Sequence, residues 1–196
     1  MKKYFAEFLG TFALSFVVLL AVASTAPIAI PVIAGLTLAL FVYTIGSISG
    51  SHINPAVTLG LLSIRKISAR DASFYVVAQL VGALVAVMLA GAFSITSLIG
   101  GKEFSFVIFL AEVIGTLFFT FGIASVVYGK VSDHMSGLVV GGSLLLGILI
   151  ASMAGSLGIL NPAVALALNS LTVLYLFAPV VGSIAGFQLY KYLASE

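Results

Sequence analysis

The string Asn-Pro-Ala-Val occurs twice in the chain, at Asn54–Val57 and at Asn161–Val164. Asparagine is a favoured N-cap residue and proline is favoured at the first helical position, so each string predicts the start of a helix. The capping oxygen of each asparagine is expected to accept from the backbone N–H of the third helical position, Val57 or Val164. Each side-chain amide nitrogen then remains as a hydrogen-bond donor that can face an open space. The predicted motif residues are Asn54, Pro55, Ala56, Asn161, Pro162 and Ala163.

Other residues that could carry chemistry are sparse. The chain has no cysteine, two histidines and six carboxylates, which leaves little basis for a disulfide, a metal centre or a cofactor. No Ser-His-Asp, His-Glu-x-x-His or paired-carboxylate arrangement is recognisable, so we do not expect an enzyme. No basic stretch is longer than a pair such as Arg65-Lys66, so we do not expect nucleic-acid binding.

The composition is that of an integral membrane protein. Of the 196 residues, 62% are hydrophobic and only 7% are charged, whereas soluble domains carry about 25% charged residues. The mean hydropathy is +1.30. So few charged groups cannot cover a surface of this size in contact with water.

The positions of charges, prolines and glycines divide the chain into spans. A helix needs about 20 apolar residues to cross a bilayer. The uncharged stretch 8–64 is too long for one span and is broken at Pro27 and again before Asn54. The six predicted spans cover residues 4–24, 28–48, 72–93, 104–127, 136–153 and 173–192. Two predicted helices are too short to cross, at 54–64 and 161–170.

The two halves of the chain resemble each other. The residues around Glu7 match those around Glu112, and the segment Ala78–Gly82 matches Ala178–Gly182. Because each half has three spans, an odd number, the second half is expected to be inverted in the membrane. Paired interruptions in inverted repeats point to a translocation site. We therefore expect one transmembrane domain, residues 1–196, with repeats over about 1–97 and 104–196.

Inversion should bring the two short helices together. A helix of about 10 residues is about 15 Å long, which is half of the hydrocarbon thickness. Their N-termini would meet near the midplane, where both positive dipole ends oppose cations. Non-helical backbone at this depth is tolerated where it is buried in protein or lines a wet cavity. We expect a ladder of carbonyl acceptors at Gly50, Ser51, His52, Leu157, Gly158 and Ile159.

The cations predict the orientation of the chain. Seven of the eight Lys and Arg residues fall on the side of the membrane that carries both termini, and only Lys102 falls on the other. Cytoplasmic loops carry an excess of these residues. We therefore expect cytoplasmic termini, in a multi-pass protein of the cell (inner) membrane.

These motifs and their flanks resemble the aquaporin and glycerol-facilitator (major intrinsic protein) family over essentially the whole chain. The segment Ser49–Thr58 is a near-complete match to the first signature of that family. The resemblance implies an all-α, aquaporin-like fold, a channel through each protomer, and a homotetramer in the lipid bilayer. It also implies that Glu7 and Glu112 accept from backbone N–H groups of the re-entrant loops and hold the carbonyl ladder in position.

One position departs from the family pattern. Most aquaporins have arginine directly after the second motif, where this chain has Val164. Alignment from the motifs places the other three residues of the outer constriction at Ala34, Leu149 and Gly158. This set has no charged, aromatic or hydrogen-bonding side chain. We predict a passive channel for water and small neutral solutes such as glycerol or ammonia, with an arginine-free selectivity filter.

Two other functions stay open at this point. A secondary transporter also has inverted repeats and broken helices, although ion coupling normally needs ionisable groups at the midplane, where only His52 adjoins an asparagine. A non-conducting structural role in the membrane is the second alternative, because a missing arginine could mark a closed pore.

Overall fold

The computed structural model describes residues 1–24, 29–95, 100 and 104–195. The predicted break at Pro27 and the single outer cation Lys102 lie outside these residues. The described part is all-helical and contains no strand. Its helices are α1 (Lys2–Ala23), α2 (Ile30–Ser49), α3 (Pro55–Ser63), α4 (Ala69–Ala92), α5 (Phe106–Val127), α6 (Asp133–Met153), α7 (Pro162–Ala167) and α8 (Val173–Ala194).

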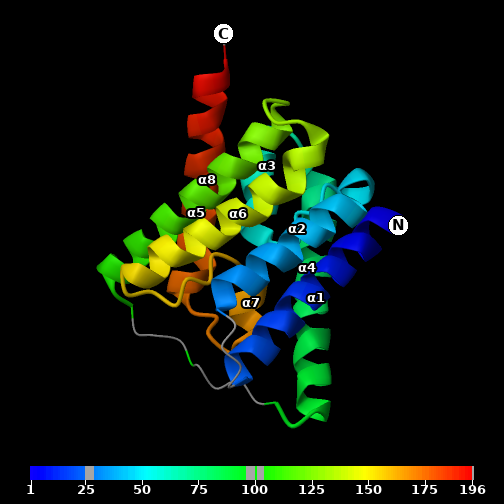
Figure 1. Cartoon of the computed structure of the whole chain (residues 1–196), viewed down its shortest axis with the longest axis vertical. Helices are drawn as coiled ribbons and strands as arrows, with labels where there is room; N and C mark the ends of the chain where they lie inside the picture. Colours follow the sequence, from blue (N-terminus) through cyan, green and yellow to red (C-terminus); the bar gives the residue numbers. More distant parts are fainter. Residues whose placement is uncertain (25–28, 96–99, 101–103, 196) are drawn as a thin grey trace.

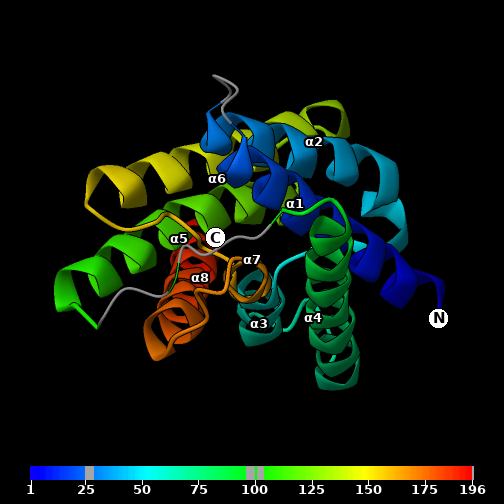
Figure 2. The same cartoon turned by 90° about the horizontal axis from the view of Figure 1, so that it is seen from below.

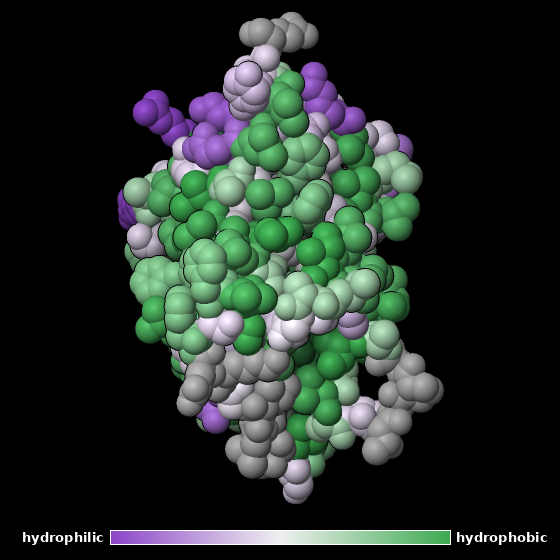
Figure 3. Space-filling model, turned by 90° about the vertical axis from the view of Figure 1, so that its left-hand side faces the viewer, coloured by the Kyte–Doolittle hydropathy of each residue, from purple (hydrophilic) through white to green (hydrophobic). Residues whose placement is uncertain are grey.

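Six of these helices, α1, α2, α4, α5, α6 and α8, have the length and hydropathy of membrane spans. The largest errors in the predicted boundaries are three residues, at the starts of α4 (predicted 72, observed 69) and α6 (predicted 136, observed 133). Hydrophobic side chains form a broad belt over the surface, and hydrophilic ones gather at the end that carries the C-terminus (Figure 3). The predicted all-α membrane fold is confirmed.

The two short helices lie inside the bundle. In Figure 1, α3 lies toward the end that carries the C-terminus and α7 toward the opposite end. Seen from below, they overlap near the centre, between α4 and α8 (Figure 2). Helix α1 packs on α2 and α4, α5 packs on α6 and α8, and α2 contacts α6. The long helices therefore enclose the segments that carry the two asparagines.

Both short helices end in the same hydrogen-bonded turn. Arg65 follows α3 at φ +61° and Asn169 follows α7 at φ +54°, which is left-handed backbone. The next residue donates its N–H back into the helix, from Lys66 to the Leu61 carbonyl and, over 2.9 Å, from Ser170 to the Ala165 carbonyl. Because this turn begins at Asn169, α7 is shorter than the predicted helix over 161–170.

Glycine allows the outer helices of each half to approach closely. A Cβ atom on Gly82 of α4 would lie 2.5 Å from the Phe8 carbonyl oxygen of α1, and a Cβ atom on Gly182 of α8 would collide with the Val113 carbonyl oxygen of α5. Helices in a membrane associate through such close backbone packing, because lipid removes the hydrophobic driving force between them. The two halves therefore use equivalent glycines for equivalent helix pairs.

Replacing Gly82 by alanine is expected to lower the free energy of unfolding by about 1–3 kcal/mol, the usual cost of overpacking. The matched control is Gly91→Ala in the same helix, since a Cβ atom there meets nothing within 4 Å. Alanine is the better helix former, so this control should be neutral or slightly stabilising. Unfolding by denaturing detergent measures both. Equal stability of the two variants would contradict the packing argument.

Candidate functional site

The two asparagines join the starts of α3 and α7 across the interior. The Asn54 Nδ2 atom donates to the carbonyl oxygen of Leu160 over 2.9 Å, and Asn161 Nδ2 donates to the carbonyl oxygen of Ile53 over 3.1 Å. Each side chain therefore binds the loop that precedes the other motif. Each amide group therefore uses one of its two N–H hydrogens to bind the opposite loop. The sequence alone had suggested that the whole NH₂ group faces the open space.

The same side chains cap their own helices. Asn54 Oδ1 accepts from the Ala56 N–H over 2.8 Å, and Asn161 Oδ1 accepts from the Ala163 N–H over 3.0 Å and the Val164 N–H over 3.4 Å. The expected bond from the third helical position, Val57, is wrong for the first motif. With its nitrogen bonded to the opposite loop, the Asn54 amide has its oxygen at the second helical position, whereas the Asn161 oxygen also reaches the third position at the longer distance of 3.4 Å.

Glu7 binds the loop before the first motif from behind. Its Oε1 atom accepts from the Ser49 hydroxyl over 2.7 Å and the His52 N–H over 2.9 Å. Its Oε2 atom accepts from the Ile53 N–H over 2.6 Å and from Gln79 Nε2 over 2.8 Å. The side chain is fully buried. Four donors surround the carboxyl group, an arrangement that suits an ionised carboxylate, which only accepts.

Glu112 has the corresponding place in the second half, with one donor fewer. It accepts from the Ser156 hydroxyl, from the Ile159 N–H over 3.0 Å and from the Leu160 N–H over 2.8 Å. It too is fully buried. Both loops are thus tied to a carboxylate on a neighbouring span, which leaves their backbone in an unusual conformation: Ile53 and Leu160 both have positive φ, at +38° and +53°.

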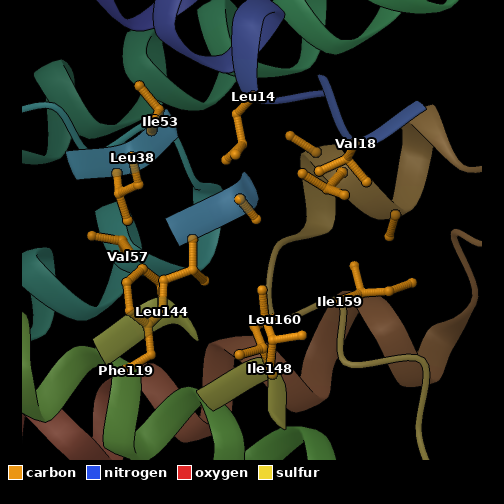
Figure 4. Close-up of a cluster of buried hydrophobic side chains, with 14 of the residues drawn as sticks. Leu14, Val18, Leu38, Ile53, Val57, Phe119, Leu144, Ile148, Ile159 and Leu160 are labelled. Atoms are coloured by element: carbon orange, nitrogen blue, oxygen red, sulfur yellow. The ribbon is translucent and has the colours of Figure 1, made fainter. Parts of the chain in front are cut away.

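A cavity of about 150 Å³ lies beside the joined helix starts. Apolar side chains of α1, α2, α5 and α6 form about half of its lining. Leu14, Leu38, Phe119 and Leu144 among them are drawn in Figure 4 as part of the buried hydrophobic cluster. The polar side chains among the described lining residues are His52, Asn54 and Asn161, and none of the described lining residues is charged. The polar groups all come from the two re-entrant segments, so one wall can form hydrogen bonds and the facing wall cannot.

Known proteins resemble this chain in sequence. The family model described as major intrinsic protein matches residues 1–190. The glycerol uptake facilitator protein-like 6 of Lactiplantibacillus plantarum is 35% identical to this chain, with 100% of both proteins covered. Aquaporin AqpM of Methanothermobacter thermautotrophicus is 32% identical, with 100% of this chain and 98% of that protein covered.

A solved structure agrees with these relatives. The aquaglyceroporin from Plasmodium falciparum overlays on this chain with a TM-score of 0.73 and 25% sequence identity, covering 97% of this chain and 95% of that one. The chain belongs to the major intrinsic protein family. This major intrinsic protein is therefore an integral multi-pass membrane protein and a channel for water and small solutes, and the expectation that it is not an enzyme is confirmed.

The cavity lining of this major intrinsic protein differs at one position from the set that the sequence suggested for the outer constriction. Ala34, Gly158 and Val164 line the cavity, but Leu149 does not. The Leu149 side chain is 39% exposed on the outside of the bundle, whereas Ile148 is 6% exposed and lines the cavity. One residue along a helix is a rotation of about 100°. The prediction of Leu149 is wrong by this one step, and Ile148 takes its place.

Four of the six residues predicted for the carbonyl ladder lie at the cavity. His52, Leu157, Gly158 and Ile159 line it, whereas Gly50 and Ser51 do not. Sequence reasoning missed further lining residues: Leu168, directly after α7, and, on the long helices, Leu14, Val18, Val22, Ile30, Leu38, Phe119 and Leu144. Some recur at intervals of four, as Leu14 and Val18 do, but the lipid-facing stripes of the same helices are equally apolar.

Proposed function

We propose that this chain is a passive channel for water and small neutral solutes such as glycerol or ammonia, with an outer constriction that lacks arginine. The observation that supports the proposal is that Ala34, Ile148, Gly158 and Val164 all line the cavity, and we propose that they form a ring around the passage. No side chain in this ring is charged or forms hydrogen bonds. The ring lies on the same cavity as both asparagines, so a permeating molecule meets the two in series.

An apolar ring changes the balance between solutes. Each hydrogen bond that a permeating molecule loses at the ring is worth about 0.5–1.5 kcal/mol net. A solute with apolar faces loses fewer hydrogen bonds at the ring than a solute that is polar on all sides. The ring therefore favours permeation of the solute with apolar faces. Cation exclusion then depends on the positive N-terminal ends of α3 and α7, which are joined through Asn54 and Asn161.

The remaining roles follow from the same geometry. We assign the loop carbonyls of His52, Leu157, Gly158 and Ile159 as acceptors for permeating molecules, and Glu7 and Glu112 as the carboxylates that hold these loops. The paired hydrogen bonds of the two carboxylates support a single domain of inverted repeats. The resemblance to the family supports a homotetramer. The cation distribution supports cytoplasmic termini in the cell (inner) membrane.

The experiment is stopped-flow light scattering with the purified protein in lipid vesicles, under osmotic and solute gradients. We expect water and glycerol to equilibrate faster than in protein-free vesicles. Ile148→Phe should reduce both rates several-fold by filling the cavity, and Leu149→Phe, on the outer surface, is the matched control that should not. No increase over empty vesicles for any neutral solute would contradict the proposal, and equal loss in both variants would contradict the corrected register.

The same vesicles separate a channel from a carrier. A pore gives the same unidirectional glycerol flux whether the opposite side holds glycerol or not. Acceleration by solute on the opposite side would favour the secondary-transporter alternative, which the channel relatives do not support.

A further inference from the structure

Three polar residues of the first half have apolar counterparts in the second. The motif alignment pairs His52 with Ile159 and Thr58 with Ala165, and the alignment of α4 with α8 pairs Gln79 with Pro179. The carboxylates that hold the loops correspond, since Glu7 matches Glu112 and both loops donate to them.

These three residues form one hydrogen-bonded chain. Gln79 Nε2 donates to Glu7 Oε2 over 2.8 Å and to Thr58 Oγ1 over 3.0 Å. The Thr58 hydroxyl donates to the Asn54 carbonyl oxygen over 3.1 Å, and it lies 3.1 Å from His52 Nδ1. Glu7, Thr58 and Gln79 are fully buried. The chain thus connects a buried carboxylate to an imidazole ring at the cavity.

The hydrogen bonds of the Thr58 hydroxyl point to one tautomer of His52. A threonine hydroxyl has one hydrogen and two acceptor positions. We infer that this hydrogen points at the Asn54 carbonyl, which lies 3.1 Å away, and that one acceptor position takes the Gln79 amide. The second acceptor position then faces His52 Nδ1. Nδ1 must then carry the proton and donate, which leaves Nε2 unprotonated.

The orientation of Gln79 supports this count. Turning its amide by 180° would point the Gln79 carbonyl oxygen at the Glu7 carboxylate, where two acceptors would repel. The amide therefore keeps its nitrogen toward both Glu7 and Thr58. Glu7 in this way acts on His52 through two intermediate side chains.

The unprotonated nitrogen has no hydrogen-bond partner among the described residues. His52 lines the cavity, its ring packs edge-on against Tyr75 with centroids 5.0 Å apart, and no described residue hydrogen-bonds to Nε2. The side-chain oxygens of Asn54 and Asn161 are occupied in capping their own helices. Among the described lining residues, His52 Nε2 is thus a side-chain acceptor that makes no hydrogen bond to the protein.

We propose that Gln79 and Thr58 are positioning residues that hold His52 in its Nδ1–H tautomer, so that Nε2 is a specificity-determining acceptor for permeating molecules that donate hydrogen bonds. Such molecules carry O–H or N–H groups, as water, alcohols and ammonia do. The role in permeation rests on the proposed function, whereas the tautomer does not. Holding the carboxylate does not by itself require Gln79. In the second half Pro179 stands at the equivalent position and supplies no donor, and Glu112 is held by three other donors.

Solid-state nitrogen-15 NMR of histidine-labelled protein in lipid vesicles tests the tautomer directly. The chain has two histidines, so a His134→Asn variant assigns the two sets of signals. We expect His52 to show a protonated Nδ1 and an unprotonated Nε2. Thr58→Val has nearly the same shape without the hydroxyl and should lose this signature, and Thr58→Ser should retain it. A proton on Nε2 in the unmodified protein, or an unchanged spectrum in Thr58→Val, would overturn the proposal.

Permeability of the same vesicles tests the consequence. Thr58→Val should lower glycerol flux about two- to tenfold relative to Thr58→Ser, the factor that corresponds to one lost hydrogen bond. Equal flux in the two variants would overturn the role in specificity while leaving the tautomer assigned. Absence of flux in the unmodified protein, with the expected NMR signature, would instead contradict the proposed function.

Discussion

Replacing Glu7 with glutamine is expected to lower the free energy of unfolding by about 2–6 kcal/mol and to abolish permeability. An amide in this place turns one oxygen acceptor into an NH₂ group, which then faces two donors. The pair is either Ser49 with the His52 N–H or Gln79 with the Ile53 N–H. A buried donor without an acceptor costs about 1–3 kcal/mol. The loop would also lose the contact that holds its backbone at positive φ.

Glu112→Gln provides a graded comparison, because its carboxylate accepts from three groups where Glu7 accepts from four. Its Oε2 atom meets a single described donor, so the amide can place its nitrogen there with less loss. We expect Glu112→Gln to be the milder change. Asp133→Asn, at the exposed start of α6, is the control and should stay within about 0.5 kcal/mol of the unmodified protein. Unfolding in denaturing detergent measures all three, and equal stability of Glu7→Gln and the control would refute the account.

Replacing Val164 with arginine is expected to reduce glycerol permeability at least about tenfold and water permeability only about two- to threefold. A tenfold reduction corresponds to an increase of about 1.4 kcal/mol in the barrier to permeation. The Val164 side chain is 5% exposed and lines the cavity, as do Ala34 and Ile148. A guanidinium group occupies much more of this space than a valine. It also supplies up to five N–H donors, which compensate a small polar molecule such as water for bonds it loses in the narrowed passage.

The control for this prediction is Val164→Leu, which adds bulk without donors or charge. It should reduce water and glycerol flux by similar factors, whereas arginine should separate them. Circular dichroism and gel filtration of each purified variant establish that it is folded before flux is measured. Equal reduction of both solutes by arginine would show that Val164 does not face the permeating molecules.

Much of the fold follows from patterns that are local in the chain. Asn54-Pro55 and Asn161-Pro162 combine a capping residue with a proline that fits only the first turn, so the starts of α3 and α7 were predictable to the residue. The apolar stretches bounded by charges located the six spans to within three residues. The end of α7 was less predictable, because Asn169 in left-handed backbone leaves no strong signal in the sequence.

The lining of the cavity was harder to predict, for a physical reason. In a soluble protein the polar face of a helix marks its outside, but here both lipid and cavity accept apolar side chains. Ile148 and Leu149 are chemically alike, and only the packing of α6 decides that Ile148 faces inward at 6% exposure while Leu149 faces outward at 39%. Leu14, Leu38 and Phe119 were missed for the same reason.

The sequence by itself determined the membrane location, the number of spans, the two helix starts and the family to which the chain belongs, because these depend on composition and on short motifs. Only the tertiary structure decided which faces line the cavity, that each asparagine binds the opposite loop, and that Glu7, Gln79, Thr58 and His52 form one chain. These contacts join residues up to 108 positions apart. Their geometry depends on how the helices pack against one another, which no local pattern in the sequence records.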